Sequence, residues 1–298
     1  MKRAIIGLII LALTPVIVHG QEYAFKVLVN KGNNEVKAGS NWAPIKVGAS
    51  LKPDDQLKVA DNAYLGLVHV TGKPVEVKKA GTYKVADLAG KVSGGSSVLN
   101  KYTDFILSEN AQKNNRLVAT GAVVRGGKNI KVFLPEAQNA VTYGSKVYIG
   151  WDTDKAKGPY IVTITSMFGD ELSKIETGDS VIQVDLYDRK FQNEDNILFT
   201  VQAKDDPATK TDPAAVIKKI SKADRDRIKS SLSDFNKTLS EETALNKLLL
   251  AGFFEQNGLL IDAIAAYQEA ITLEPEVASF KEQYVDFLIR NSIKEVKE

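Results

Sequence analysis

The chain of 298 residues contains no cysteine, two histidines, two tryptophans and two methionines. Without cysteine there are no disulfides, so each domain must be stabilised by its own hydrophobic core, and a small disulfide-stapled fold is excluded. A lipid-anchored lipoprotein is excluded as well. Only His69 remains after the first twenty residues. Because cysteine and histidine are the usual zinc ligands, we expect no metal site and no cofactor.

Neither sign of charge prevails. Of the 39 basic residues, Lys2 and Arg3 lie within the first twenty positions, which leaves 37 basic against 37 acidic residues in the rest of the chain. Binding to nucleic acid needs a basic surplus that displaces counterions from the phosphates. We therefore expect no nucleic-acid partner.

Long apolar runs are missing beyond the N-terminus, where Met1-Lys2-Arg3 precedes AIIGLIILAL at residues 4–13. A positive start, a short apolar core and small residues before a cleavage point are typical of a secretory signal peptide. Pro15 interrupts the run, which is shorter than the ~20 residues that span a bilayer. We expect residues 1–20 to be a cleaved signal peptide, no membrane span after cleavage, and a periplasmic or otherwise exported chain.

Residues 21–127 are expected to form a β-domain with a trailing helix. The segments YLGLVHV and VEVKK flank a turn at Thr71-Gly72-Lys73-Pro74, which predicts a hairpin. From Val98 the apolar period changes from two to that of a helix, with Tyr102, Phe105 and Ile106 on one face.

The stretch from 39 to 85 resembles the β-domain of FecR-type periplasmic regulators. The matching positions are Trp42, Gly48, Leu51, Asp55, Leu57, Leu65, Leu67, Gly72, Val75 and Val77. The resemblance implies an exported β-fold used in envelope sensing or scaffolding. FecR-type regulators carry a cytoplasmic segment and a spanning helix before this domain. The signal pattern found here instead argues against an anti-sigma role.

Residues 128–203 return to short strands at regular spacing with turn signals between them, which favours a β-sandwich. This stretch loosely resembles immunoglobulin or fibronectin type III modules. Trp151 and Tyr160 are expected in its core. The segment AKDDPATKTDPAA that follows has no large apolar residue, and we expect a linker at 204–215.

Residues 216–298 are expected to form a helical bundle. Asp212-Pro213 is a favourable helix start, and the apolar face expected to follow it is Ile217, Ile220, Ile228, Leu232, Phe235 and Leu239. Two further helices are expected to end at Asn257-Gly258 and at Glu274-Pro275, with a fourth helix after them.

The spacing within 244–277 is similar to one tetratricopeptide repeat, a 34-residue helix–turn–helix. The matching positions are Leu250-Ala251, Phe254, Ala263, Tyr267, Ala270 and Pro275, whereas Lys247 stands where the family has a tryptophan. Because an independent solenoid needs about three repeats, the alternative is a four-helix bundle that contains one repeat-like hairpin.

One subclass of that family holds a peptide carboxylate with cations on the inner face of the first helix. The inner-face positions here are Leu245, Leu248, Leu249, Gly252 and Glu255, none of which is a cation, so that ligand mode is excluded. This face is expected either to be covered by the 213–239 helix or to bind an apolar partner.

No catalytic constellation can be assembled. His69 is expected within a strand, whereas a Ser-His-Asp site would need it at a loop edge. AVVRGGKN lacks the first glycine, at Ala122, and the hydroxyl residue, at Asn129, that a phosphate loop needs. We expect no catalytic residues and no enzyme.

These patterns favour an exported, non-enzymatic envelope protein that acts as a protein-interaction scaffold or adaptor, a hypothesis that rests on fold-level analogy. The first alternative is a glycan or peptidoglycan binder in which Trp42 or Tyr64 stacks on sugar. The second is a sensor module that feeds a membrane partner.

Overall fold

Strands dominate the first two thirds of the chain and helices the last third. The computed structural model describes residues 23–119, 129–239 and 241–295. In these ranges several antiparallel sheets are combined with α-helices, including a C-terminal helical region, so the expected mixed β and α class is confirmed. The expected signal peptide and the expected junction near 127 lie outside the described residues. No helix within the described ranges is long and apolar enough to cross a membrane.

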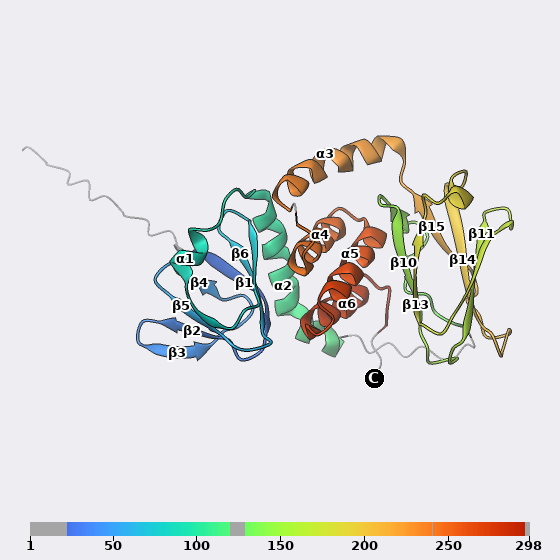
Figure 1. The fold of residues 1–298 in the computed structure, drawn as a ribbon. Helices are drawn as coiled ribbons and strands as arrows, with labels where there is room; N and C mark the ends of the chain where they lie inside the picture. Colours follow the sequence, from blue (N-terminus) through green and yellow to red (C-terminus); the bar gives the residue numbers. More distant parts are fainter. Residues whose placement is uncertain (1–22, 120–128, 240, 296–298) are drawn as a thin grey trace, which may run out of the picture.

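Two four-stranded sheets enclose the core of the N-terminal β-module, residues 23–92 (Figure 1). One sheet has the order β4-β1-β6-β7, formed by Ser50–Leu51, Phe25–Lys31, Tyr64–His69 and Pro74–Val77. The other has the order β3-β2-β5-β8, formed by Asn41–Pro44, Glu35–Ala38, Gln56–Val59 and Gly81–Lys84. A short helix, α1 (Val85–Ala89), follows β8.

The predicted hairpin is the β6–β7 pair. The His69 N–H donates to the Lys73 carbonyl at 2.9 Å, and the Gly72 N–H donates to the His69 carbonyl at 2.7 Å. Gly72 has φ +85°, a left-handed conformation that glycine adopts without steric cost. The turn fixes a register that pairs Leu67 with Val75, Gly66 with Glu76 and Leu65 with Val77.

The second β-module, residues 129–219, contains a five-stranded sheet and a two-stranded sheet. The larger has the order β12-β11-β14-β15-β9, formed by Glu171–Thr177, Tyr160–Ser166, Asn196–Ala203, Ala215–Lys219 and Val141–Thr142. The smaller pairs β10 (Lys146–Gly150) with β13 (Val181–Asp185), and a 3-10 turn, η1 (Arg189–Phe191), precedes β14. Trp151 and Tyr160 are both buried, with ring centroids 5.3 Å apart in an edge-on arrangement.

The segment 204–219 differs from the expectation of a linker followed by a helix. The Thr211 N–H donates to the Val201 carbonyl at 2.8 Å, so the chain turns back along β14. Residues Ala215–Lys219 then form β15 in the same sheet, and Ile217 is fully buried there. The predicted helix start at Asp212-Pro213 is therefore wrong. The first C-terminal helix begins at Lys222, where the Ser221 hydroxyl accepts the Asp224 N–H.

Five longer helices form a layer of their own. They are α2 (Val98–Ala119), α3 (Lys222–Thr238), α4 (Ala244–Gln256), α5 (Leu260–Leu273) and α6 (Ala278–Arg290). Helices α4 and α5 form a closely packed hairpin, in which the small residues expected at the crossing, Ala251, Ala263 and Ala270, are fully buried.

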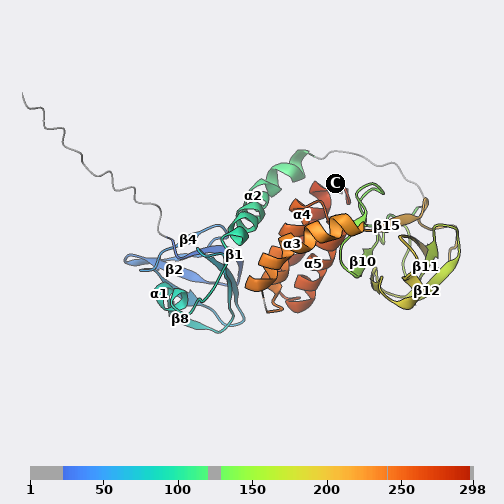
Figure 2. The ribbon, with the colours of Figure 1, turned by 90° about the horizontal axis from the view of Figure 1, so that it is seen from above.

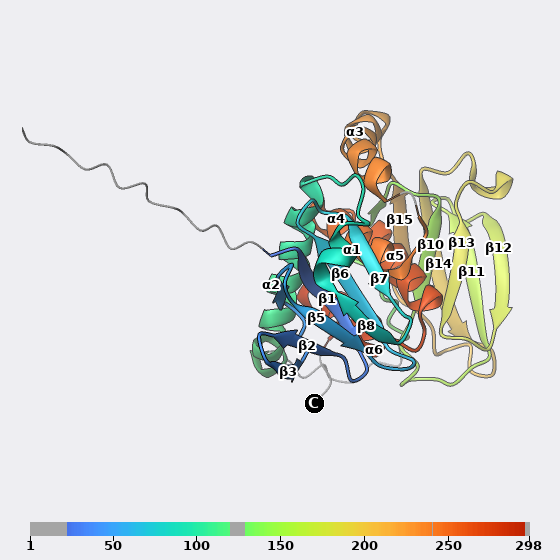
Figure 3. The same cartoon turned by 60° about the vertical axis from the view of Figure 1, so that its left-hand side comes forward.

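The helices lie between the two β-modules (Figures 1 and 2). Figure 3 shows the N-terminal β-module in front of them. One continuous cluster of buried apolar residues runs from the helix-facing side of β1 and β6, through α2 to α6, into the second β-module. We call this cluster the shared core. The N-terminal β-module has a second, separate core between its own sheets.

Candidate functional site

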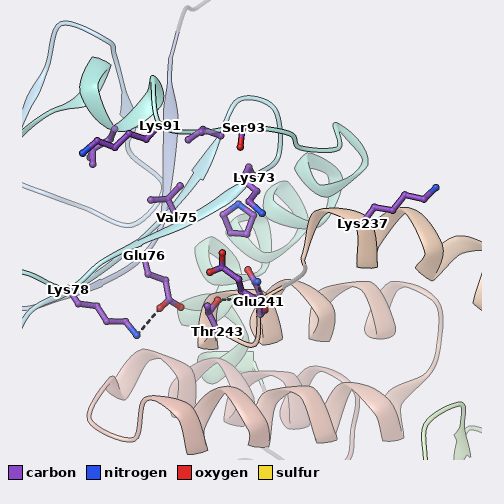
Figure 4. Close-up of a pocket in the computed structure, with 13 residues that line it drawn as sticks. Lys73, Val75, Glu76, Lys78, Lys91, Ser93, Lys237, Glu241 and Thr243 are labelled. Carbon is purple, nitrogen blue, oxygen red and sulfur yellow. Dashed lines mark hydrogen bonds and ion pairs between the residues drawn. The ribbon is translucent and has the colours of Figure 1, made fainter.

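A pocket of about 830 Å³ lies where the N-terminal β-module meets the helices (Figure 4). We call it the β7 pocket. Its walls come from three parts of the chain: β7 and its flanks, the segment after α1, and the connection from α3 to α4. The lining residues are Lys73, Pro74, Val75, Glu76, Lys78, Leu88, Lys91, Val92, Ser93, Lys237, Glu241, Thr243 and Asn246.

Strand β7 forms one wall because it is the outer strand of its sheet in the part of the chain that the structure describes. The hydrogen bond from His69 to Lys73 sets the alternation of the antiparallel pair. Val75 and Val77 then bond to β6, whereas the backbone N–H and C=O of Glu76 point away from β6. The pocket therefore borders backbone hydrogen-bonding groups as well as side chains.

The Glu76 carboxylate joins β7 to the helices. It accepts the Tyr64 hydroxyl at 2.5 Å and the Leu245 backbone N–H, in the first turn of α4, at 2.9 Å. The Lys78 ammonium lies 2.8 Å from its other oxygen and also pairs with Glu274. Burial opposes ionisation of Glu76, but the bonds from Lys78, Tyr64 and Leu245 outweigh it and lower the pKa of this carboxyl. Glu76 is therefore ionised at neutral pH.

The opposite wall is fixed by hydrogen bonds at the start of α4. The Thr243 hydroxyl accepts the Asn246 N–H at 3.2 Å, and the Asn246 side-chain amide donates to the Glu241 carbonyl at 2.7 Å. The Lys73 ammonium donates to the Thr238 carbonyl at 2.8 Å, so the β6–β7 hairpin is tied to the end of α3. In Figure 4, Lys91 and Ser93 lie on one side of Val75, and Glu76, Glu241 and Thr243 on the other.

The lining of the β7 pocket contains more positively than negatively charged side chains. Four lysines and two glutamates line the pocket; Lys78 is paired with Glu76 and with Glu274, which leaves Lys73, Lys91 and Lys237 against Glu241. These three lysines come from all three walls. The pocket therefore favours a negatively charged ligand.

The inner-face residues of α4 lie inside the protein. Leu245 and Leu248 have no exposed surface, and Gly252 is buried with its α-carbon against α2. A Cβ on Gly252 would lie 3.1 Å from the Ile106 side chain, and a Cβ on Gly66 would lie 3.0 Å from the Leu245 side chain. The chain covers this face itself. Ile106 of α2 lies against Gly252 and Gly66 of β6 against Leu245, and Phe235 of the 213–239 segment packs on Phe253 of α4, with ring centroids 5.0 Å apart.

Glu255 is engaged within the helical layer. Arg290 donates to both Glu255 oxygens, at 2.6 and 2.5 Å, and to Asp286 at 2.7 Å. The same guanidinium reaches the Tyr267 hydroxyl at 3.1 Å. Because a bidentate pair of this kind fixes both side chains, Glu255 holds α4 against α6.

The two aromatic residues expected to stack on sugar differ in exposure. Trp42, on β3, is 38% exposed. Tyr64 is 2% exposed, because its ring packs edge-on against Phe280 at 5.6 Å and its hydroxyl is bonded to Glu76. His69 ends β6, and its Nδ1 lies 2.9 Å from the Thr71 hydroxyl. In the described ranges no group of three or more His, Asp or Glu side chains is placed to hold a metal ion.

The sequence patterns predict no functional role for any residue of the β7 pocket. The local signal was the pair of lysines, Lys73 and Lys78, that flank the short strand PVEV. That signal is weak, because lysines beside an outer strand are also a common protection against aggregation. The residues of the other two walls lie more than ten positions from β7 in the sequence, and their spacing does not predict that they pack beside it.

Comparisons with known proteins add little. No family model and no curated protein matches the chain. A solved structure titled as the complex of Porphyromonas gingivalis RgpB pro- and mature domains is 16% identical over 31% of this chain. The match covers 19% of the length of that chain, with a TM-score of 0.22. A likeness this low carries no argument about fold or function.

Proposed function

We propose that the chain is a non-enzymatic, exported cell-envelope protein that acts as a scaffold or adaptor. In this role it holds two β-modules in a fixed mutual arrangement for contact with other envelope proteins. The observation that supports the proposal most is the shared core, in which one apolar cluster includes residues of both β-modules and all five longer helices. Modules joined by a buried apolar interface move as one body, unlike modules on a flexible linker.

Polar contacts strengthen the junction between the N-terminal β-module and the helices. Glu76 accepts the Leu245 N–H, Lys78 pairs with Glu274 just after α5, and Lys26 pairs with Asp104 of α2 at 2.6 Å. These bonds connect one sheet to three different helices. Surface pairs of this kind contribute little energy singly, but they restrict sliding between the layers.

The junction with the second β-module is built on α5. The Asp262 carboxylate accepts backbone N–H groups from the turn between β9 and β10, and α5 packs along β10. Buried polar groups are costly unless they are satisfied, so this junction is favourable in one geometry only. The helical layer thereby fixes the second module as it fixes the first.

A glycan or peptidoglycan binder is the second candidate, supported by the exposed Trp42 ring. The burial of Tyr64 removes the other stacking residue that this function would use. A sensor that feeds a membrane partner remains a third use of the same rigid arrangement.

The test uses residues 21–298 as one chain, because isolated helices would expose the shared core. Tagged protein is incubated with envelope extract and, separately, with purified cell-wall sacculi. The scaffold function predicts a stoichiometric envelope protein that co-elutes and is retained after Trp42→Ala. Sedimentation with sacculi that is lost in Trp42→Ala, without any protein partner, would contradict the scaffold function and support the glycan binder.

A further inference from the structure

The β7 pocket has the features of a strand-binding site, and we infer that it binds an extended, acidic segment of a partner polypeptide that adds a strand to β7. The site rests on the proposed scaffold function and deepens it, because it specifies the kind of segment that a partner would present. Three independent observations support the site: an open strand edge, a cavity beside that edge, and an excess of lysines around the cavity.

The strand edge supplies backbone hydrogen bonds. Among the described strands none pairs with the outer side of β7, and the Glu76 N–H and C=O point to that side. A peptide that lies beside β7 would accept from this N–H and donate to this carbonyl, as in β-strand addition. Pro74 has no N–H, so the register of an added strand is centred on Glu76.

The cavity gives the added strand room. Neighbouring strands in a sheet lie about 4.8 Å apart, and the β7 pocket of about 830 Å³ lies along that side of β7. On one wall, Leu88 and Val92 offer apolar surface to alternate side chains of a peptide. On the other wall, at the start of α4, the Asn246 N–H is already bonded to Thr243 and the Leu245 N–H to Glu76.

The lysines select the charge of the segment. Lys91 and Lys237 lie on opposite walls, and Lys73 directly precedes β7. A basic strand could form the same backbone hydrogen bonds but would be repelled by these lysines, and a neutral strand would not be attracted by them. Side chains alternate along a strand, so the apolar residues of the peptide would face Leu88 and Val92 and the acidic residues between them would face the wall that bears Lys237. This arrangement suits a segment that alternates acidic and apolar residues.

The experiment measures binding of a defined probe to the folded chain, residues 21–298. The probe is a fluorescent peptide with the sequence Glu-Val-Glu-Val-Glu, blocked at both ends. Its controls are Lys-Val-Lys-Val-Lys and an acidic peptide N-methylated at alternate amides, which cannot complete a ladder. Affinity is read from fluorescence anisotropy at low and moderate salt, and exchange of the Glu76 amide proton is followed by NMR.

We expect the acidic peptide to bind and both control peptides to bind at least about tenfold more weakly. Saturation should slow exchange of the Glu76 amide proton by about tenfold or more, because that N–H becomes part of a ladder. The variant Lys91→Glu/Lys237→Glu should weaken binding by about tenfold, whereas Lys155→Glu/Lys157→Glu, with the same charge change on the second β-module, should alter it by less than about twofold. Melting curves show beforehand that both variants are folded.

Several outcomes would overturn the site. If the acidic peptide does not bind, the site is wrong. If the N-methylated peptide binds equally well, binding reflects charge attraction without strand addition. If Lys91→Glu/Lys237→Glu and Lys155→Glu/Lys157→Glu weaken binding equally, the peptide does not bind at the β7 pocket. If these tests fail while the chain still retains an envelope protein, the scaffold function stands and the β7 site is wrong. If no protein is retained either, both are wrong.

Discussion

Asp262 of α5 accepts a 2.6 Å hydrogen bond from the Gly144 backbone N–H, across the junction between the helices and the second β-module. The Tyr143 N–H donates to the same carboxylate at 2.7 Å, and the Thr142 hydroxyl at 3.3 Å. Asp262 as a whole is 3% exposed. One buried side chain thus satisfies two backbone donors that lie more than a hundred residues away in sequence.

Replacing Asp262 with alanine should destabilise the chain by about 2–5 kcal/mol at pH 5, because two buried N–H groups lose their acceptor. The measurement is the free energy of unfolding in urea for residues 21–298. Asp226→Asn, at an exposed position of α3, serves as the control and should change that energy by less than about 0.5 kcal/mol. An Asp262→Ala variant as stable as the wild type would show that the junction does not depend on this contact.

The effect of Asp262 should also depend on pH. Burial raises the pKa of this carboxyl from 3.8 to about 6, against the opposing effect of its three donors. Because the folded pKa is the higher one, the folded state binds more protons between pH 4 and 6, and stability falls as pH rises through that window. The stability advantage of the wild type over Asp262→Ala should therefore shrink from pH 4 to pH 7, by up to about 3 kcal/mol. An advantage that grows with pH would contradict this assignment.

Glu76 should show the opposite dependence. Its pKa is lowered in the folded state, so its contribution is present above the unfolded pKa, near 4.5, and is lost as pH falls below it. Glu76→Gln should cost about 1–3 kcal/mol at pH 7, because a charged acceptor of three bonds is replaced by a neutral one. The cost should decline below pH 4.5. Glu276→Gln, at an exposed position before α6, is the matched control, and an equal effect there would refute the role of Glu76.

The inner face of α4 should behave as protein core. Leu245→Asp/Leu248→Asp places two charges in the shared core and should abolish cooperative unfolding, since each uncompensated buried charge costs several kcal/mol. Leu273→Asp, at a 43% exposed position on α5, should leave the melting temperature within a few degrees of the wild-type value. Circular dichroism of the three proteins measures both effects. A folded Leu245→Asp/Leu248→Asp protein would mean that this face is accessible after all.

Much of the secondary structure can be predicted from local patterns in the sequence. The β6–β7 hairpin, the helix from Val98 and the helix ends near Asn257 and Glu274 follow from turn residues and apolar periodicity. Ile217 and Ile220 continue the helical spacing of Ile228 and Leu232, and this pattern predicts a helix where the structure has β15. In the structure β14 supplies hydrogen-bonding partners to this segment, and tertiary pairing overrides the local pattern.

The candidate site was not predictable, because its walls meet only in the folded chain. Lys73, Lys91 and Lys237 are far apart in sequence and come together when the helices pack on the N-terminal sheet. The same applies to the cover of α4. An apolar inner face indicates that something must bury it, but the sequence does not show that Ile106 of α2 and the strand β6 do so beside the 213–239 segment.

The central claim, that the helices hold the two β-modules in one arrangement, is tested most directly by a distance measured between the modules. The chain has no cysteine, so Lys46→Cys and Lys157→Cys introduce two unique spin-label sites, one on each module. Pulsed electron spin resonance of this doubly labelled protein should give a single distance distribution, about as narrow as that of a Lys46→Cys/Asp61→Cys reference within the N-terminal β-module. A broad or multiple distribution between the modules, beside a narrow reference, would contradict the account.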